Sequence, residues 1–237
     1  MKKILLVIAI VAVLLPLAAC GVKVVNKSVT GNQRIIKQEV PNVAYFNKIE
    51  SNASVDIKFV QDNKNGVTLR GTKQLLDKII VKVDEKNKSL LISVANNSRL
   101  ITSDMDDAEV LVSSPDLNSV SLFGAGDFES ERSLKTNELK VEVNGAGDID
   151  FKRLDCDKVY FTLNGAGDID VDALKANYTD ININGAGDVD VDFVNSGDVK
   201  CSLYGAGNVE LSGKVKTLSQ NVHGAGNIET YKLIVGK

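Results

Sequence analysis

Apolar and polar residues alternate over most of the chain from Phe46 onward. In Val55-Asp56-Ile57-Lys58-Phe59 the apolar side chains would face a core and the polar ones would face solvent. The same alternation predicts further strands at 67–70, 79–83, 90–94, 110–112 and 120–122. Polar residues predict a hairpin loop at 84–88 and an exposed acidic loop at 98–107, and residues 75–78 favour a short helical turn. The pattern indicates an all-β protein.

From residue 124 a longer period is added to this alternation. The tetrapeptide Gly-Ala-Gly-Asp or Gly-Ala-Gly-Asn occurs six times, and its first glycines are separated by 21, 20, 20, 20 and 19 residues. Apolar pairs two residues apart flank each copy, and Leu154, Leu174 and Val194 form a third apolar column. A fixed period of about 20 residues predicts a three-sided β-solenoid, in which no coil is stable without its neighbours.

The glycines of the repeat are predicted to form the corner of each coil. Glycine permits positive φ and a close approach of two backbones, which a Cβ would prevent. The alanine between the glycines is expected to point inward as the small residue of a tight corner. The corner glycines are Gly124, Gly126, Gly145, Gly147, Gly165, Gly167, Gly185, Gly187, Gly205, Gly207, Gly224 and Gly226.

Three polar columns run beside this corner. The first holds Asn144, Asn164 and Asn184, continued by Tyr204 and His223, and predicts a ladder of hydrogen-bonded amides. The inner acidic column follows the second glycine and consists of Asp127, Asp148, Asp168, Asp188, Asn208 and Asn227. The outer acidic column consists of Glu129, Asp150, Asp170, Asp190, Glu210 and Glu229, with Asp172 and Asp192 beyond it.

Stacked carboxylates repel one another, and three explanations are open. The inner column can accept backbone N–H bonds in the turn, which agrees with its interchange of Asp and Asn. The outer column can be a solvated face. Both can bind Ca²⁺, which takes six to eight oxygen ligands. The Ca²⁺ candidates are Asp148, Asp150, Asp168, Asp170, Asp188 and Asp190. No other cofactor is predicted.

The beginning of the chain has the pattern of an export signal. Lys2 and Lys3 precede an apolar run over 4–15, which is too short to span a bilayer. The run ends in Leu17-Ala18-Ala19-Cys20, which is similar to a bacterial lipobox. This predicts a lipoprotein signal peptide at 1–19, acylation (palmitate) of Cys20, and a tether at 20–32. A plain signal peptide cut after Ala19 is the alternative.

The other two cysteines are predicted to be free thiols. Cys156 and Cys201 are 45 residues apart, which is two coils plus five residues. Two coils at about 4.8 Å each exceed the roughly 7 Å between Cα atoms that a disulfide allows. Cys201 aligns with Phe161 and Ile181 and is expected to act as a small buried hydrophobic residue.

Several of these motifs occur in an order that resembles a known family. Phe46 and Ile49 open the pattern, Val55–Phe59 and Leu90-Leu91-Ile92 follow, and the segment 115–120 leads into the first Gly-Ala-Gly. This order is similar to the DUF2807 family, from about Asn32 to the C-terminus. The resemblance implies a right-handed parallel β-helix on a secreted or lipid-anchored bacterial protein, with adhesion suggested by the family's name. On this basis 33–123 forms a less regular N-terminal part and 124–237 the regular solenoid.

The resemblance also bears on location. Similar lipoproteins of Bacteroidota carry acidic residues after the cysteine when they reach the cell surface. Here Lys23 and Lys27 follow Cys20 without an acidic cluster. We therefore expect attachment to the outer membrane, with the periplasmic face favoured over the cell surface.

Charge and residue types narrow the function. Residues 124–229 carry 19 Asp and Glu against 10 Lys and Arg, which argues against a nucleic-acid partner. Uniform coils leave no room for an active-site loop, and His223, the one histidine, lies in the ladder column. Tyr160 aligns with Asp180 and not with Tyr178, so no aromatic strip for stacking sugars is expected.

We expect a non-catalytic envelope lipoprotein that acts by adhesin-like binding or as structure. The alternatives are a polysaccharide-active β-helix enzyme and a Ca²⁺-binding assembly element. The expected partners are the membrane, through Cys20, and a glycan or an envelope or matrix protein. The strand at 231–235 either covers the open end of the solenoid or leaves it free for a homo-oligomer through coil ends.

Overall fold

The computed structural model describes residues 34–95 and 108–236. The predicted signal peptide, Cys20, the tether and the predicted loop at 98–107 lie outside the described residues. What is described forms a 14-stranded sheet and one short helix, which confirms the all-β prediction. Within the described part of the chain, no helix has the length and apolar character needed to cross a membrane.

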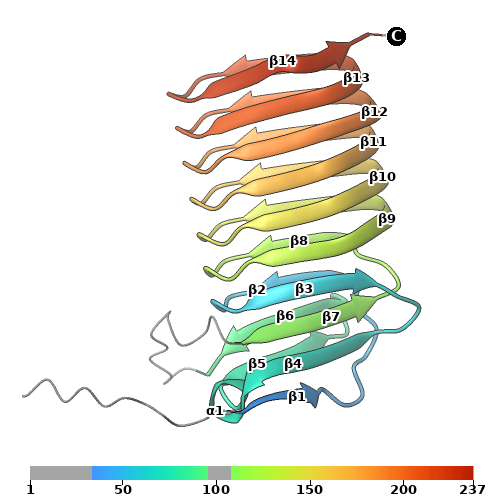
Figure 1. Cartoon of the computed structure of the whole chain (residues 1–237), viewed down its shortest axis with the longest axis vertical. Coiled ribbons are helices and arrows are strands. Elements are labelled where there is room, and N and C mark those ends of the chain that lie inside the picture. The colour runs from blue at the N-terminus through green and yellow to red at the C-terminus, as the bar shows by residue number, and fades with distance from the viewer. Residues whose placement is uncertain (1–33, 96–107, 237) are drawn as a thin grey trace, which may run out of the picture. The chain divides into compact units, whose positions relative to one another are not determined.

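The regular solenoid consists of long parallel strands stacked one on the next (Figure 1). Val141, Phe161, Ile181 and Cys201 lie opposite one another on successive strands, which confirms the period of about 20 residues. One strand runs around each coil from corner to corner, and its pairing to the neighbouring coils has local irregularities at the bends. The strands are β9 (Phe128–Val143), β10 (Ile149–Leu163), β11 (Ile169–Ile183), β12 (Val189–Leu203), β13 (Asn208–Val222) and β14 (Asn227–Val235).

Shorter strands continue the same solenoid toward the N-terminus. β3 and β8 each pair in parallel with β9, so the less regular strands stack on the regular ones as predicted. β4, β1 and β5 are antiparallel to their neighbours. The bounds are β1 (Ile35–Glu39), β2 (Lys48–Ser51), β3 (Asp56–Gln61), β4 (Gly66–Thr72), β5 (Ile79–Asp84), β6 (Ser89–Val94), β7 (Glu109–Ser114) and β8 (Ser119–Leu122).

Two elements of this part differ from the pattern. The helical turn is α1 (Lys73–Leu76), slightly earlier than predicted, and it buries Leu75 and Leu76. β1 was not predicted, because four of its five residues are exposed and its sequence therefore shows no alternation.

The core lies inside the coils and follows the alternation closely. Phe59, Phe128 and Phe151 pack in series, with ring centroids 6.1 and 5.6 Å apart. The third apolar column was assigned wrongly in one coil, where Phe193 lies opposite Leu174 and is buried, while Val194 is only partly buried. A local change of register in β12, next to Asn195 at φ 48°, shifts the inward position by one residue.

Cys156 and Cys201 are both free thiols, as predicted, and both are buried, which was predicted for Cys201 alone. Cys201 lies opposite Ile181 and contributes to the core as a hydrophobic residue. Burial raises the pKa of each thiol to about 12, so neither is a nucleophile at neutral pH.

Candidate functional site

The corner of each coil is too crowded for any side chain at the second glycine. A Cβ on Gly167 would lie 2.7 Å from the carbonyl carbon of Gly147 and closer still to its oxygen. Neither glycine has positive φ, contrary to one of the two reasons expected for their presence. The other reason, close approach of successive coils, accounts for the glycine columns by itself.

The alanine between the two glycines points outward. Ala146, Ala166 and Ala186 are exposed, and Gly147, Gly167 and Gly187 are buried. The prediction of an inward alanine is therefore wrong. Side chains alternate across the corner as they do in a strand, so the second glycine takes the inward place and the alanine lies on the surface.

The inner acidic column is bonded from coil to coil. The backbone N–H of Asp148, Asp168 and Asp188 each donates to the carboxylate of the preceding coil's Asp, at 2.8, 2.8 and 2.7 Å. Asn208 donates to Asp188 Oδ1 in the same way, at 2.6 Å. The predicted acceptor role is thus present, but the donor comes from the next coil and not from the same turn. These bonds explain how the carboxylates can stack.

An earlier corner belongs to this column and was missed. The N–H of Asp127 donates to Asp56 Oδ1 at 3.1 Å, and the first repeat packs on the backbone of Ala53 and Val55. Residues 53–56 therefore occupy the corner position in an N-terminal coil. Only Asp56 retains the repeat's sequence, so the aspartate was the one available signal.

The outer acidic column lies on a solvent-facing strip of β9–β13. Asp150 lies opposite Glu129 and Asp170, and Asp170 lies opposite Asp190. Partial desolvation, followed by the like charge of neighbouring carboxylates, raises the pKa of Asp150, Asp170 and Asp190 above the usual value. At its N-terminal end, Lys58 neutralises Glu129 and Glu131 at 3.3 Å each.

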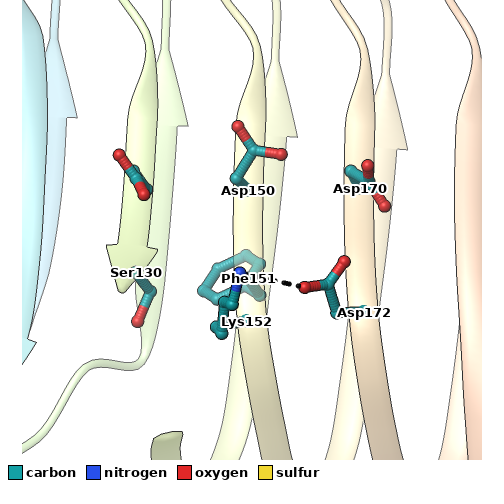
Figure 2. Close-up of a pocket in the computed structure, with 7 residues that line it drawn as sticks. Ser130, Asp150, Phe151, Lys152, Asp170 and Asp172 are labelled. Carbon is teal, nitrogen blue, oxygen red and sulfur yellow. Dashed lines mark ion pairs between the residues drawn. The ribbon is translucent and has the colours of Figure 1, made fainter. Parts of the chain in front are cut away.

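A shallow depression of about 200 Å³ lies on this strip (Figure 2). Asp150 and Asp170 lie along one side of it, and Lys152 forms an ion pair of 3.5 Å with Asp172 across β10 and β11 (Figure 2). The depression is open, and Lys152 already compensates one of its carboxylates. It therefore offers a charged surface and not an enclosed site.

The six Ca²⁺ candidates occupy two different columns. Asp148, Asp168 and Asp188 use one carboxylate oxygen each for the bonds between coils. Among the residues that the structure describes, no group of three or more His, Cys, Asp or Glu is placed to hold a metal ion. The candidates thus lie near one another along the solenoid without converging as ligands.

The amide ladder is present as predicted. Asn164 donates to Asn144 at 2.9 Å, and Asn184 donates to Asn164 at 2.8 Å. Tyr204 and His223 continue the column and stack on each other, with ring centroids 5.3 Å apart and planes at 16°. Phe123, which is 48% exposed, stands at the other end of the column and was not recognised as part of it.

Together these residues form a narrow uncharged surface that we call the corner ridge. It has two parallel rows, and almost all of its members are solvent-exposed. The first row is Phe123, Asn144, Asn164, Asn184, Tyr204 and His223, and the second row is Ala125, Ala146, Ala166, Ala186, Ala206 and Ala225. Apolar rings stand at both ends of a row of amides, and this surface can contact a partner through both stacking and hydrogen bonds.

A second aromatic pair lies elsewhere on the solenoid. Tyr160 aligns with Asp180 as predicted, yet its ring centroid lies 6.1 Å from that of Tyr178. The two rings form a pair without being in register, because large side chains on adjacent strands reach their diagonal neighbours. Both tyrosines are half-buried, so the pair offers less exposed ring surface than Tyr204.

His223 lies in the ladder column, as the alignment predicted. Its Nε2 lies 2.9 Å from Asn221 Nδ2, and its ring stacks on Tyr204. In the described part of the chain, it has no carboxylate or hydroxyl partner that would make it an acid or a base.

Comparison with solved structures finds the same fold in proteins of the Bacteroidales. A putative adhesin from Bacteroides fragilis NCTC 9343 is 23% identical, with a TM-score of 0.69 over 85% of this chain and 98% of that one. A putative adhesin from Parabacteroides merdae ATCC 43184 is 17% identical, with a TM-score of 0.64 over 86% and 98%. A putative lipid binding protein from Parabacteroides distasonis ATCC 8503 is 16% identical, with a TM-score of 0.55 over the same shares. At these identities the likeness shows the fold.

Sequence comparison gives the family. The comparison with curated proteins finds no match. The family model described as "Putative auto-transporter adhesin, head GIN domain" matches residues 45–174 and 160–237, which together cover most of the chain. The chain belongs to the DUF2807 family.

Proposed function

We propose that this protein is a non-catalytic lipoprotein of the cell envelope that binds a partner along its solenoid, in the manner of an adhesin. The family description and the names of structural neighbours support adhesion as the class of function. The corner ridge is the observation that carries the proposal. It presents exposed rings, amides and methyl groups in register over successive coils. The hydrogen bonds and stacking within the solenoid leave the solvent-facing side of these groups free.

A glycan or an envelope or matrix protein fits this ridge best. Tyr204 is 52% exposed and backed by His223, which makes a flat apolar platform beside the amides of the ladder. Sugars combine apolar ring faces with hydroxyl groups, and many protein surfaces combine aromatic rings with amide and hydroxyl groups. The acidic columns beside the ridge favour a neutral or basic partner.

The test is a binding screen of the full chain in detergent against glycans and matrix proteins, with and without Ca²⁺. We expect a ligand whose affinity falls at least tenfold in a Phe123→Ser, Tyr204→Ala variant. Tyr45→Ala is the matched control, because Tyr45 is also exposed but lies off the ridge. Absence of a ligand in both conditions, or equal losses in both variants, would contradict the proposal. A melting temperature that does not change on chelation would also remove the Ca²⁺ alternative.

Attachment through Cys20 belongs to the same proposal. The apolar run and Leu17-Ala18-Ala19-Cys20 support it, and Lys23 and Lys27 favour the periplasmic face. Metabolic labelling with palmitate should mark the wild-type chain and leave Cys20→Ala unlabelled. Protease added to intact cells should spare the protein if it faces the periplasm and should degrade it if it faces the exterior.

A further inference from the structure

Within the ranges that the structure describes, the outer edge of the last coil of the solenoid is uncovered. This coil consists of the second half of β13, from Thr217 to Val222, followed by β14. Among the described strands, β14 pairs only with β13 (Figure 1). Its outer edge therefore presents backbone N–H and C=O groups that another strand could pair with.

Among the described residues, most inward positions of this coil are apolar and uncovered, although Gln220 takes the place of Cys201 in the inward column. Val222 lies opposite Leu203, and Ile228 lies opposite Val209, and both of these partners are buried. In the last coil the corresponding side chains lose this protection: Val222 is exposed and Ile228 is only partly buried. Val235, which lies opposite the buried Val215, is 52% exposed. A large apolar end surface of this kind marks an interaction site.

The opposite end of the solenoid does not match this surface. There α1 buries Leu75 and Leu76 against the core, and the outermost strand β1 carries Lys37, Gln38 and Glu39. β1 also pairs antiparallel to its neighbour, unlike β14. Head-to-tail stacking would therefore place an apolar coil against the mostly polar edge of an antiparallel strand. A two-fold contact between identical ends is free of this mismatch and closes as a dimer.

We propose that two copies of this chain pair through their last coils, with β14 antiparallel to β14 of the second copy. One register pairs apolar residues on one face of the strand and oppositely charged residues on the other. Ile228 then lies opposite the partner's Leu233, and Glu229 lies opposite the partner's Lys232. The two-fold axis repeats each pair, so the contact gains two apolar pairs and two ion pairs across the strands.

This strand carries charges of both signs. In the single chain Lys232 donates to Glu210 Oε1 on β13 at 2.7 Å, and the proposed contact adds the partner's Glu229 as a second carboxylate. Glu229 is exposed. Pairing would join the two cores end to end and cover the edge of β14, which no described strand covers within one chain.

A charge exchange tests the dimer in the full chain. Sedimentation velocity in detergent of matched density should show a dimer for the wild type, with a dissociation constant at least tenfold higher for Lys232→Glu and for Glu229→Lys. The double variant Glu229→Lys, Lys232→Glu should recover the dimer. Lys140→Glu, in the middle of the solenoid, is the control and should leave the constant unchanged. Glu210 lies opposite position 229 in the same chain, so Glu210→Gln is the second control: it removes the bond within the chain and should leave the dissociation constant within about twofold of wild type.

Cross-linking tests the register directly. Glu229→Cys with Lys232→Cys should give a disulfide-linked dimer on oxidation, and either single variant should give at least tenfold less. A monomer throughout, as expected if another segment of the same chain covers the coil, would overturn the proposal. A dimer whose dissociation constant and cross-linking are unchanged by the charge and cysteine substitutions at positions 229 and 232 would also overturn it. The ligand screen above does not depend on this result.

Discussion

At the scale of single residues, the corner separates two neighbours that the repeat presents together. Gly167 lies inward and has the backbone of Gly147 against its Cα, whereas Ala166 lies outward in solvent. The short distance between coils requires the glycine, whereas the exposed alanine position places no such limit on the size of the side chain. Substitutions to the same residue at these two adjacent positions should therefore differ greatly in their cost to stability.

Gly167→Val should destabilise the fold by about 4 kcal/mol or more, the range of severe packing defects. The added side chain cannot be accommodated unless two coils move apart, which would break the parallel pairing on both sides. Ala166→Val is the control and should change stability by less than about 0.5 kcal/mol. Thermal unfolding monitored by circular dichroism measures both. Equal midpoints would contradict the assignment of the inward position to the glycine.

The outer acidic column makes a prediction about pH. The pKa values of Asp150, Asp170 and Asp190 are raised in the folded chain, mainly by desolvation and then by like charges. Just above the usual value of 3.8, the folded chain therefore binds more protons at these groups than the unfolded chain does. Their contribution to the free energy of unfolding falls as pH rises through that window and stays unfavourable at neutral pH.

Asp170→Asn should therefore stabilise the protein at pH 7, by at most about 0.5 kcal/mol because the strip is exposed. The advantage over wild type should disappear as the pH falls through the raised pKa, where Asp170 itself becomes neutral. Chemical denaturation of both proteins at pH 7 and pH 4 measures the difference. A destabilised variant at pH 7 would show that the carboxylate has a favourable partner and not only repulsive neighbours.

At the scale of elements, each coil is one strand that bends, and local register decides which residue faces the core. In β12 the change of register places Phe193 inward, opposite Leu174, in the position where the period alone selects Val194. Phe193→Ala should cost about 3–5 kcal/mol, because it leaves a cavity in a packed core. Val194→Ala should cost clearly less. Guanidinium denaturation compares them, and the reverse order would mean that the register of β12 is wrong.

The amide ladder links consecutive elements through one side chain per coil. Asn164 both donates to Asn144 and accepts from Asn184. Asn164→Asp keeps the acceptor but replaces the donor with a second oxygen, so it should cost about 1 kcal/mol at pH 7. Below its ordinary pKa of about 3.9 the protonated carboxyl can donate again. Partial recovery of the thermal midpoint relative to wild type at pH 3 is the expected signature.

At the scale of the molecule, stability comes from stacking, and the coils are unequal in how many neighbours they have. β10 and β11 are paired on both edges, whereas β14 is paired on one among the described strands. In a stacked array each repeat is stabilised by its adjacent interfaces. Amides of β14 should therefore exchange with deuterium at least tenfold faster than those of β10 in dilute protein. Exchange at β14 that slows with rising concentration would agree with the proposed dimer.

Much of this architecture could be predicted from particular residues of the sequence. The spacing of Gly124, Gly145 and Gly165 gave the period, and the alternation around them placed Phe161, Ile181 and Cys201 in one inward column. The asparagine ladder followed from the same alignment. The strand at 35–39 was missed because it is mostly exposed, and the corner at 53–56 because only its aspartate matches the repeat.

What the sequence determined by itself is periodic: the coil length, the inward columns, the ladder and the unpaired thiols. These follow from repetition, because equivalent residues in a stacked array meet each other. The tertiary structure decided what repetition cannot express. It showed that the alanines of the corner face outward, that the inner carboxylates bond to the following coil, and that Tyr160 meets Tyr178 diagonally. Each of these depends on the direction of a side chain relative to the next coil, which only the packed backbone fixes.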